Sequence, residues 1–245
     1  MVPWPIWEKR WRMAYDACCA MGPLAKANSS PPTIEPAASE AEVVAVEQRL
    51  GVRLPTAFRD TLIHFSRRTK FSWYCDPYDC KLVGPPKSVW SVVAGMCHWD
   101  LGRLEELDTA RQQWARTFND PKRGFDQVWQ RKVVAIQQDG YGNLLALDAS
   151  PDGGGAVVYL SHDDDAAHGY CLGRDFLDFM DRWSQVGCAG PHVRGWLPFT
   201  TGPQSLIDPN CQNARTWRKW FGLEEVFDEG EQDATADGGR DSGSS

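Results

Sequence analysis

The stretch that decides the fold reads VVAIQQDGYGNLLALDASPDGGGAVVYL over residues 133–160. Its apolar runs, rich in β-branched residues at either end, predict three strands over 133–137, 144–148 and 156–160. Residues 138–143 contain two glycines and an asparagine, which tolerate the positive φ angles of a tight reversal. Three strands in succession joined by short turns predict an antiparallel meander.

A helix is predicted directly after the meander, over residues 175–183. Phe176, Phe179, Met180 and Trp183 follow the spacing i, i+3, i+4, i+7 and form one apolar stripe. That stripe predicts that the helix covers one face of the sheet. With further strands predicted over 71–74 and 89–94 and a helix over 101–118, the fold class is α+β. We expect a mostly antiparallel sheet of about five or six strands with packed helices, plus extra terminal helices.

Two helices are predicted upstream of the meander, over residues 39–50 and 55–65. Ser39 followed by Glu42 three residues later is a capping box, and Gly51 is the glycine that ends such a helix. Pro55 opens the second helix at its first turn, where its missing N–H costs nothing.

The two ends of the chain add aromatic helices. Trp4, Trp7 and Trp11 share one face of a helix predicted over 5–20, and residues 28–36 are predicted to be a proline-rich linker. Residues 187–203 are predicted to be loop-like. Asp208-Pro209 then predicts the start of a last helix, from which Trp217 or Trp220 should pack back onto the body. We expect four parts: an N-terminal helix and linker over 1–38, an α+β domain over 39–185, a helical extension of the core over 186–227, and a disordered acidic tail over 228–245.

The net charge of −7 is concentrated at the C-terminus. Residues 224–245 hold eight carboxylates and one arginine, which leaves 25 acidic and 25 basic residues in the rest of the chain. A neutral body without a basic stripe argues against nucleic acid as a partner. Absence of a secretory signal or a long apolar run favours a cytoplasmic protein that does not contact a membrane. In that compartment the eight cysteines are expected to be reduced.

No cofactor or metal site is predicted. Cys75 and Cys80 have no matching second pair of zinc ligands, and adjacent Cys97-His98 rarely supplies two ligands to one ion. The acidic loop from His162 to His168 is interpreted as solvated rather than metal-binding. The glycine run at 153–155 lacks the lysine of a phosphate-binding loop, and no serine nucleophile motif is present, so no catalytic residue is assigned.

Protein binding is the remaining use that the residues suggest. Aromatic residues beside acids in loops suit a protein interface, where Trp and Tyr are favoured anchors. The partner-binding residues predicted on this basis are Trp73, Tyr74, Asp139, Tyr141 and Asp163. Two alternatives stay open: Trp73 and Trp99 belong to the core, and Asp139 serves only its turn.

Five segments in order resemble the SUKH superfamily, which contains bacterial immunity proteins and fungal regulators of cell-wall synthesis. They are the run from Glu42 through Leu50-Gly51 and Leu54-Pro55 to Leu62, then Trp99-Asp100-Leu101, Asp139-Gly-Tyr-Gly-Asn143, the strand ending before His162-Asp163, and the helix with Phe176, Phe179 and Trp183. The resemblance spans residues 39–183. It departs from the family pattern at Ser66-Arg67-Arg68, where Asn-Gly is usual, and at Asn143, where Asp is commoner.

The resemblance implies a non-enzymatic immunity protein that binds and occludes a cognate bacterial toxin in the cytosol, within a polymorphic toxin system. A non-catalytic scaffold or regulatory module, like the fungal members, is the alternative. A hydrolase using the acidic loops is a third hypothesis without positive support. The sequence does not name the toxin or the oligomeric state, since a fold does not encode them.

Overall fold

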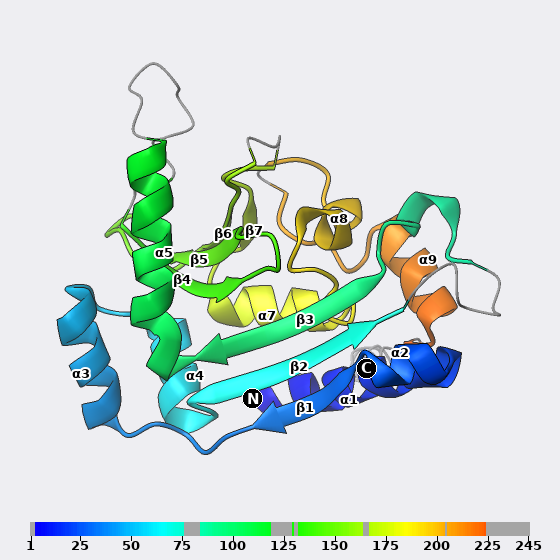
Figure 1. Cartoon of the computed structure of the whole chain (residues 1–245), viewed down its shortest axis with the longest axis horizontal. Coiled ribbons are helices and arrows are strands. Elements are labelled where there is room, and N and C mark those ends of the chain that lie inside the picture. Colours follow the sequence, from blue (N-terminus) through cyan, green and yellow to red (C-terminus); the bar gives the residue numbers. More distant parts are fainter. Residues whose placement is uncertain are drawn as a thin grey trace, which may run out of the picture.

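The structure is a computed structural model of the chain. It describes residues 3–75, 84–118, 129, 132–163, 167–203 and 205–223. Helices pack around two antiparallel sheets, one with the strand order β1-β2-β3 and one with the order β4-β5-β6-β7 (Figure 1). The predicted α+β class is confirmed. We predicted one sheet of about five or six strands, whereas the described residues form seven strands in two sheets.

The four-stranded sheet contains the predicted meander. Its strands are β4 (Val133–Gln138), β5 (Leu144–Asp148), β6 (Val157–Leu160) and β7 (Cys171–Gly173). Antiparallel pairing of β4 with β5 and of β5 with β6 confirms the meander. β7 was not predicted, since three residues are too few to show a period.

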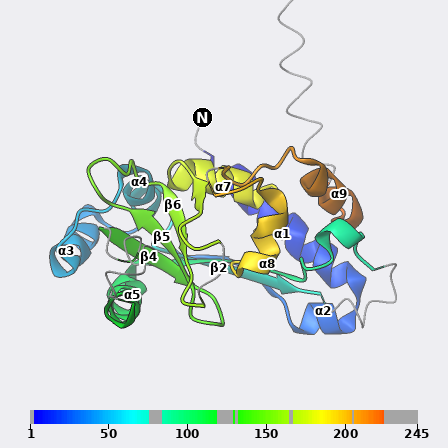
Figure 2. The ribbon, with the colours of Figure 1, turned by 90° about the horizontal axis from the view of Figure 1, so that it is seen from above.

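Both faces of this sheet are covered, whereas the sequence predicted a helix on one. Val133 and Ala135 point into a small core shared with α5 (Leu104–Thr117), and Val134 and Ile136 point into the main core shared with α7 (Phe176–Ser184). Figure 2 shows α5 and α7 on opposite sides of the strands. Burial on both faces explains why these strands are continuous apolar runs rather than alternating ones.

The first strand of the other sheet corrects the prediction of a linker over 28–36. β1 (Ser30–Ile34) pairs with β2 (Arg68–Tyr74), with Thr33 opposite Lys70. β1 is an edge strand, and its pairing register shifts between Ser30 and Thr33, across Pro31-Pro32. Edge strands and bulges are the places where a sheet tolerates prolines, so the composition resembled a linker although the backbone is extended.

The third strand lies later in the chain than predicted. β3 is Ala94–Asp100, and the preceding segment contains the short helix η1 (Lys87–Val89) instead of the predicted strand over 89–94. Burial alternates along β3 through Gly95, Cys97 and Trp99. Glycine, cysteine and methionine give this stretch little β propensity of its own, so pairing with β2 decides the strand.

The outer edge of β3 is closed by chain from elsewhere. The backbone N–H of Met96 donates to the carbonyl of Cys188 at 3.0 Å, and the N–H of Gly190 donates to the carbonyl of Ala94 at 3.0 Å. At a bulge in β4, the side-chain amide of Gln137 accepts from the His98 N–H and donates to the Met96 carbonyl, both at 2.9 Å. Gln137 therefore joins the two sheets through one side chain.

Helices α3 (Glu40–Leu50) and α4 (Thr56–His64) match the predicted pair. Ser39 and Glu42 form the capping box, which confirms that prediction. Gly51 has a φ of 65°, the left-handed conformation that a residue with a side chain rarely adopts, and it ends α3.

The N-terminal helix α1 (Trp4–Met21) runs along the three-stranded sheet (Figure 1). Trp7 and Trp11 are fully buried, and the Trp11 ring lies 6.4 Å from that of Phe71 and 6.0 Å from that of Trp99. Trp99 is thus a core residue, which decides one of the alternatives left by the sequence. Its indole N–H donates to the Ser66 carbonyl at 3.1 Å.

The C-terminal part folds back onto the same core. The segment predicted to be loop-like contains α8 (Val193–Trp196) and η3 (Leu197–Phe199), and the last helix is α9 (Gln212–Phe221). This helix begins three residues later than Asp208-Pro209 predicted, because the Cys211 side chain caps its N-terminus. Trp217 packs back onto the body, with its ring 5.7 Å from that of Trp73. The predicted acidic tail over 228–245 lies outside the described residues.

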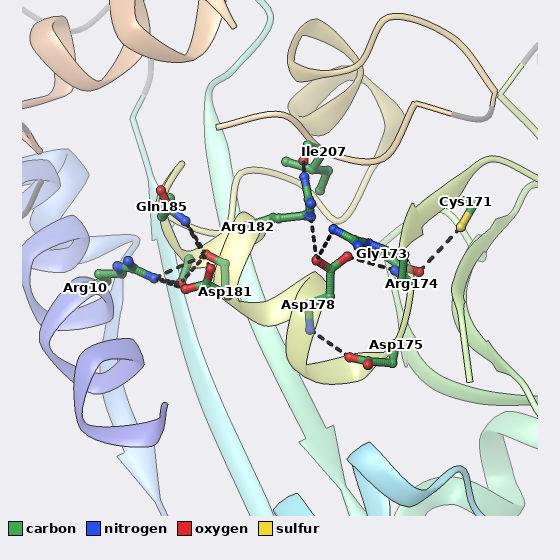
Figure 3. Close-up of polar contacts among 11 residues, drawn as sticks. Arg10, Cys171, Gly173, Arg174, Asp175, Asp178, Asp181, Arg182, Gln185 and Ile207 are labelled. Atoms are coloured by element: carbon green, nitrogen blue, oxygen red, sulfur yellow. Dashed lines mark hydrogen bonds and ion pairs between the residues drawn. The ribbon is translucent and has the colours of Figure 1, made fainter. Parts of the chain in front are cut away.

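A polar network fixes α7 between α1 and the C-terminal segment (Figure 3). The Arg10 guanidinium pairs with the Asp181 carboxylate at 2.8 Å, and Arg182 donates to the Ile207 carbonyl at 3.0 Å. Asp178 accepts from the Arg182 guanidinium and from the Arg174 backbone N–H, both at 2.9 Å. Burial alone would raise the pKa of the Asp178 carboxyl, but these hydrogen bonds and the two arginine charges outweigh burial and lower its pKa.

Replacing Asp178 by asparagine is expected to reduce the free energy of unfolding at pH 7 by about 1–2 kcal/mol, because hydrogen bonds to the charged carboxylate are lost. A carboxyl with a lowered folded pKa stabilises the protein above its unfolded pKa of about 3.9, and that contribution is lost as the pH falls through the folded value. The difference between the two proteins should therefore shrink below about pH 4 in urea unfolding. Asp152→Asn, in an exposed turn, is the control. A difference that persists unchanged at low pH would contradict this role.

Candidate functional site

The turn between β4 and β5 is built around the carboxylate of Asp139. Its Oδ1 accepts the backbone N–H groups of Tyr141 and Asn143, and its Oδ2 accepts the Asn143 side-chain amide, all at 2.9 Å. Asp139 is only 8% exposed. Gly142 completes the turn with a φ of 99°. The carboxylate predicted to contact a partner is therefore occupied within its own turn.

Asn143 connects this turn to the end of β6. Its Oδ1 accepts the backbone N–H of His162 at 3.1 Å and lies 3.0 Å from the His162 ring Nδ1. Since the Asn143 amide donates to Asp139, the oxygen faces His162, and Nδ1 of that ring carries the hydrogen of this contact. The ring also stacks on Trp114 of α5, with centroids 4.3 Å apart.

The predicted anchor Asp163 lies at the outer end of this chain of contacts. Its Oδ1 is 3.0 Å from His162 Nε2, and its side chain is 52% exposed. The structure thus links Asp139 to His162 by hydrogen bonds through Asn143, and it places Asp163 beside the far ring nitrogen of His162. These contacts hold the β4–β5 turn against β6 and α5.

Tyr141 belongs to the same turn, but its side chain is exposed. The exposed fraction is 70%, and the ring lies 4.8 Å from that of His192. His192 is the N-cap of α8, since its Nδ1 accepts the backbone N–H of Arg194 at 3.3 Å. The predicted anchor Tyr141 is therefore placed beside α8 by a contact that the sequence did not indicate.

A second exposed aromatic, Trp90, directly precedes a residue that is hydrogen-bonded to α8. Trp90 is 61% exposed and follows η1. The next residue, Ser91, donates its hydroxyl to the Arg194 carbonyl at 2.9 Å. We name Trp90, Tyr141, His192 and Arg194 the α8 surface. Three of the four were not predicted from the sequence, because a strand was predicted over 89–94 and a loop over 187–203.

Trp73 and Tyr74, the other two predicted anchors, end β2 and differ in exposure. Trp73 is only 1% exposed, and its indole N–H donates to the Gly187 carbonyl at 2.6 Å. Its side chain is therefore unavailable to a partner in this structure. Tyr74 is exposed and lies opposite Ala94 of β3.

A polar groove of about 370 Å³ lies between α3 and the end of the three-stranded sheet. Its charged groups pair with one another: Arg67 with Glu42 at 2.8 Å, and Arg68 with Glu35 at 3.1 Å and with Asp100 at 3.3 Å. Carboxylates held in ion pairs with arginine are poor general bases, because the paired charge favours their ionised form and lowers their basicity.

A smaller cavity of about 90 Å³ includes His98 and Arg103 in its wall. Burial lowers the pKa of His98, and the charge of Arg103 lowers it further, so the imidazole is neutral at pH 7.

Among the described residues, neither the cysteines nor a metal site nor a membrane-spanning helix adds a candidate functional site. Seven cysteines are free there, and burial raises the pKa of the Cys97 thiol, as does its hydrogen bond to Cys188. Cys80, weighed as a zinc ligand with Cys75, lies outside the described residues. No described group of three or more His, Cys, Asp or Glu side chains is placed to hold a metal ion. None of the described helices has the length and apolar character needed to cross a bilayer.

Comparison with known proteins gives one match. The model of the SMI1 / KNR4 family (SUKH-1) matches residues 37–182, more than half of the chain. No curated protein matches, and no solved structure matches. Trp90 and Tyr141 lie inside the matched region, whereas His192 and Arg194 lie beyond it.

Proposed function

Since this chain belongs to the SMI1 / KNR4 family (SUKH-1), we propose that it is a non-catalytic protein-binding module and, more specifically, an immunity protein. It would bind a cognate bacterial toxin in the cytosol and block it by occlusion. The mechanism requires no chemistry from the chain, only a surface that covers the toxin's own site.

One observation carries this proposal, the exposure of two large aromatics around α8. Trp90 and Tyr141 are the two most exposed large hydrophobic side chains of the described residues, at 61% and 70%. Tryptophan and tyrosine are enriched among residues that dominate binding energy in protein interfaces. Tyr141 is also held on a turn whose backbone is fixed by Asp139, so little conformational entropy is lost when it is buried by a partner.

The catalytic alternative has less support in the geometry. The carboxylates of the polar groove beside α3 are paired with arginines, and the Asp139 carboxylate accepts hydrogen bonds within its own turn. A binding module needs none of these groups to be free.

The test begins with the genes next to this one: any toxin gene found there is co-expressed with this chain, and the purified pair is studied by calorimetry. We expect a one-to-one complex and restored growth of cells that carry the toxin. Many unrelated partners with no effect on toxicity would favour the regulatory alternative. Turnover of a substrate by the purified chain would contradict the binding function altogether.

Tyr141→Ala is expected to weaken binding of that toxin about thirtyfold, which corresponds to about 2 kcal/mol for loss of an interface anchor. Its thermal unfolding should be unchanged, since an exposed side chain contributes less than about 0.5 kcal/mol to stability. Leu24→Ala is the matched control, because Leu24 is an exposed apolar residue on α2 (Pro23–Ala27), away from the α8 surface. If both variants bound the toxin with equal affinity, Tyr141 would not belong to the interface.

A further inference from the structure

The α8 surface continues into a group of exposed cations. Lys87 lies on η1, Arg194 on α8, and Arg215 and Lys219 on one side of α9, and all four side chains are exposed. η1 contacts α9, and the Ser91–Arg194 hydrogen bond joins the segment after η1 to α8. We name these four residues the basic face.

The basic face lacks counter-ions within the described ranges. None of its four members forms an ion pair there, whereas Arg49, Arg67 and Arg103 each pair with a glutamate at 2.7–2.8 Å. Asp208, the carboxylate nearest α9 in the described sequence, accepts the Asn210 backbone N–H at 2.9 Å as part of its own turn. This end of the molecule therefore presents positive charge and the exposed Trp90 together.

The matching chemistry is found in the chain itself. Residues 224–245 follow directly after α9 and contain eight carboxylates and one arginine. Their first apolar pair, Val226-Phe227, is flanked by Glu224-Glu225 and Asp228-Glu229. An acidic segment with an aromatic residue near its start complements a face that combines cations with an exposed indole.

The length of residues 224–245 and their attachment directly after α9 also favour this segment as the occupant of the basic face. α9 ends at Gly222, and the next residue, Leu223, is buried against the body. The 22 residues that follow can span up to about 75 Å when extended, at about 3.4 Å per residue, so the basic face is within reach. Because the segment is tethered, its effective concentration at the face is of the order of millimolar, enough to occupy a weak site.

We propose that the acidic segment 224–245 of the same chain docks on the basic face and covers Trp90. A partner that binds the α8 surface must then displace this segment, and its affinity is reduced by the fraction of chains in which the face is covered. The proposal goes beyond the proposed function and does not depend on a toxin.

The test uses the full chain and zero-length carbodiimide cross-linking, which joins lysine amines to carboxylates, followed by mass spectrometry. We expect Lys87 to cross-link to carboxylates of residues 224–231 at low ionic strength. The yield should fall steeply at 1 M salt, where charges are screened beyond about 3 Å. Lys70 and Lys132, which are also exposed but lie elsewhere in the fold, serve as internal controls. Lys219 is close in sequence to the segment and is not diagnostic.

Two further experiments test whether the cross-link depends on the charge of the basic face and whether it forms within one chain. Arg194→Glu should lower the Lys87 yield about fivefold, the strong end of the range for one exposed ion pair, whereas Arg53→Glu on an exposed link elsewhere should not. Mixing isotope-labelled with unlabelled chains should give cross-links within single chains only. Equal yields at Lys87 and Lys132, an unaffected yield in Arg194→Glu, or cross-links between labelled and unlabelled chains would each overturn the proposal.

Discussion

Replacing Trp73 by alanine is expected to lower the free energy of unfolding by about 3–5 kcal/mol. The Trp73 ring lies 5.7 Å from that of Trp217 and 4.6 Å from that of Phe221, and its indole N–H bonds to Gly187. One side chain thus holds β2, α9 and the segment after α7 together. For a chain of this size the change corresponds to a drop in melting temperature of about 10 °C, at 2–4 °C per kcal/mol.

Trp90→Ala provides the matched control for this experiment. It removes the same side chain from an exposed position, so its effect on urea unfolding should stay below about 0.5 kcal/mol. If Trp73→Ala were as stable as Trp90→Ala, the burial of Trp73 would not describe the protein in solution.

Asp139→Ala is expected to cost about 3 kcal/mol of stability, because two backbone N–H groups and the Asn143 amide lose their acceptor in a buried turn. The loss should extend to partner binding, since the turn presents Tyr141. Asp139 would then act on binding by positioning Tyr141, without a contact of its own.

Asp139→Asn separates these roles. It keeps one oxygen for the two backbone N–H groups but turns a second amide toward Asn143, so its loss of stability should be intermediate. A variant that folds with unchanged stability but fails to bind would show instead that the carboxylate contacts the partner directly. Urea unfolding and calorimetry on the same samples distinguish the two outcomes.

Local signals in the sequence were sufficient for much of the fold. The meander, the capping box of α3 and the glycine after it depend on residues close together in the chain, so period and turn chemistry predict them. β1, β3 and β7 depend on pairing partners elsewhere in the chain or on very few residues. The composition of β1 therefore predicted a linker, the strand before α5 was predicted too early, and β7 was not predicted.

The candidate site was less predictable for a related reason. Trp73 and Trp90 are the same residue type, both near predicted strand ends, yet one fills the core and the other faces solvent. The packing of α9 and of the segment after α7, both more than a hundred residues later in the chain, determines that Trp73 is covered. The proximity of Tyr141 and His192 likewise arises from tertiary structure, so no local pattern indicates it.

The prolines of β1 and the covered edge of β3 have a consequence for behaviour at high concentration. A free sheet edge can recruit the edge of another molecule and start a fibre. Pro31 and Pro32 carry no N–H to offer at the β1 edge, and at the β3 edge the Met96 N–H and the Ala94 carbonyl are already bonded to Cys188 and Gly190. The three-stranded sheet is thereby protected against edge-to-edge aggregation on both sides, which leaves exposed side chains rather than backbone as its means of meeting other proteins.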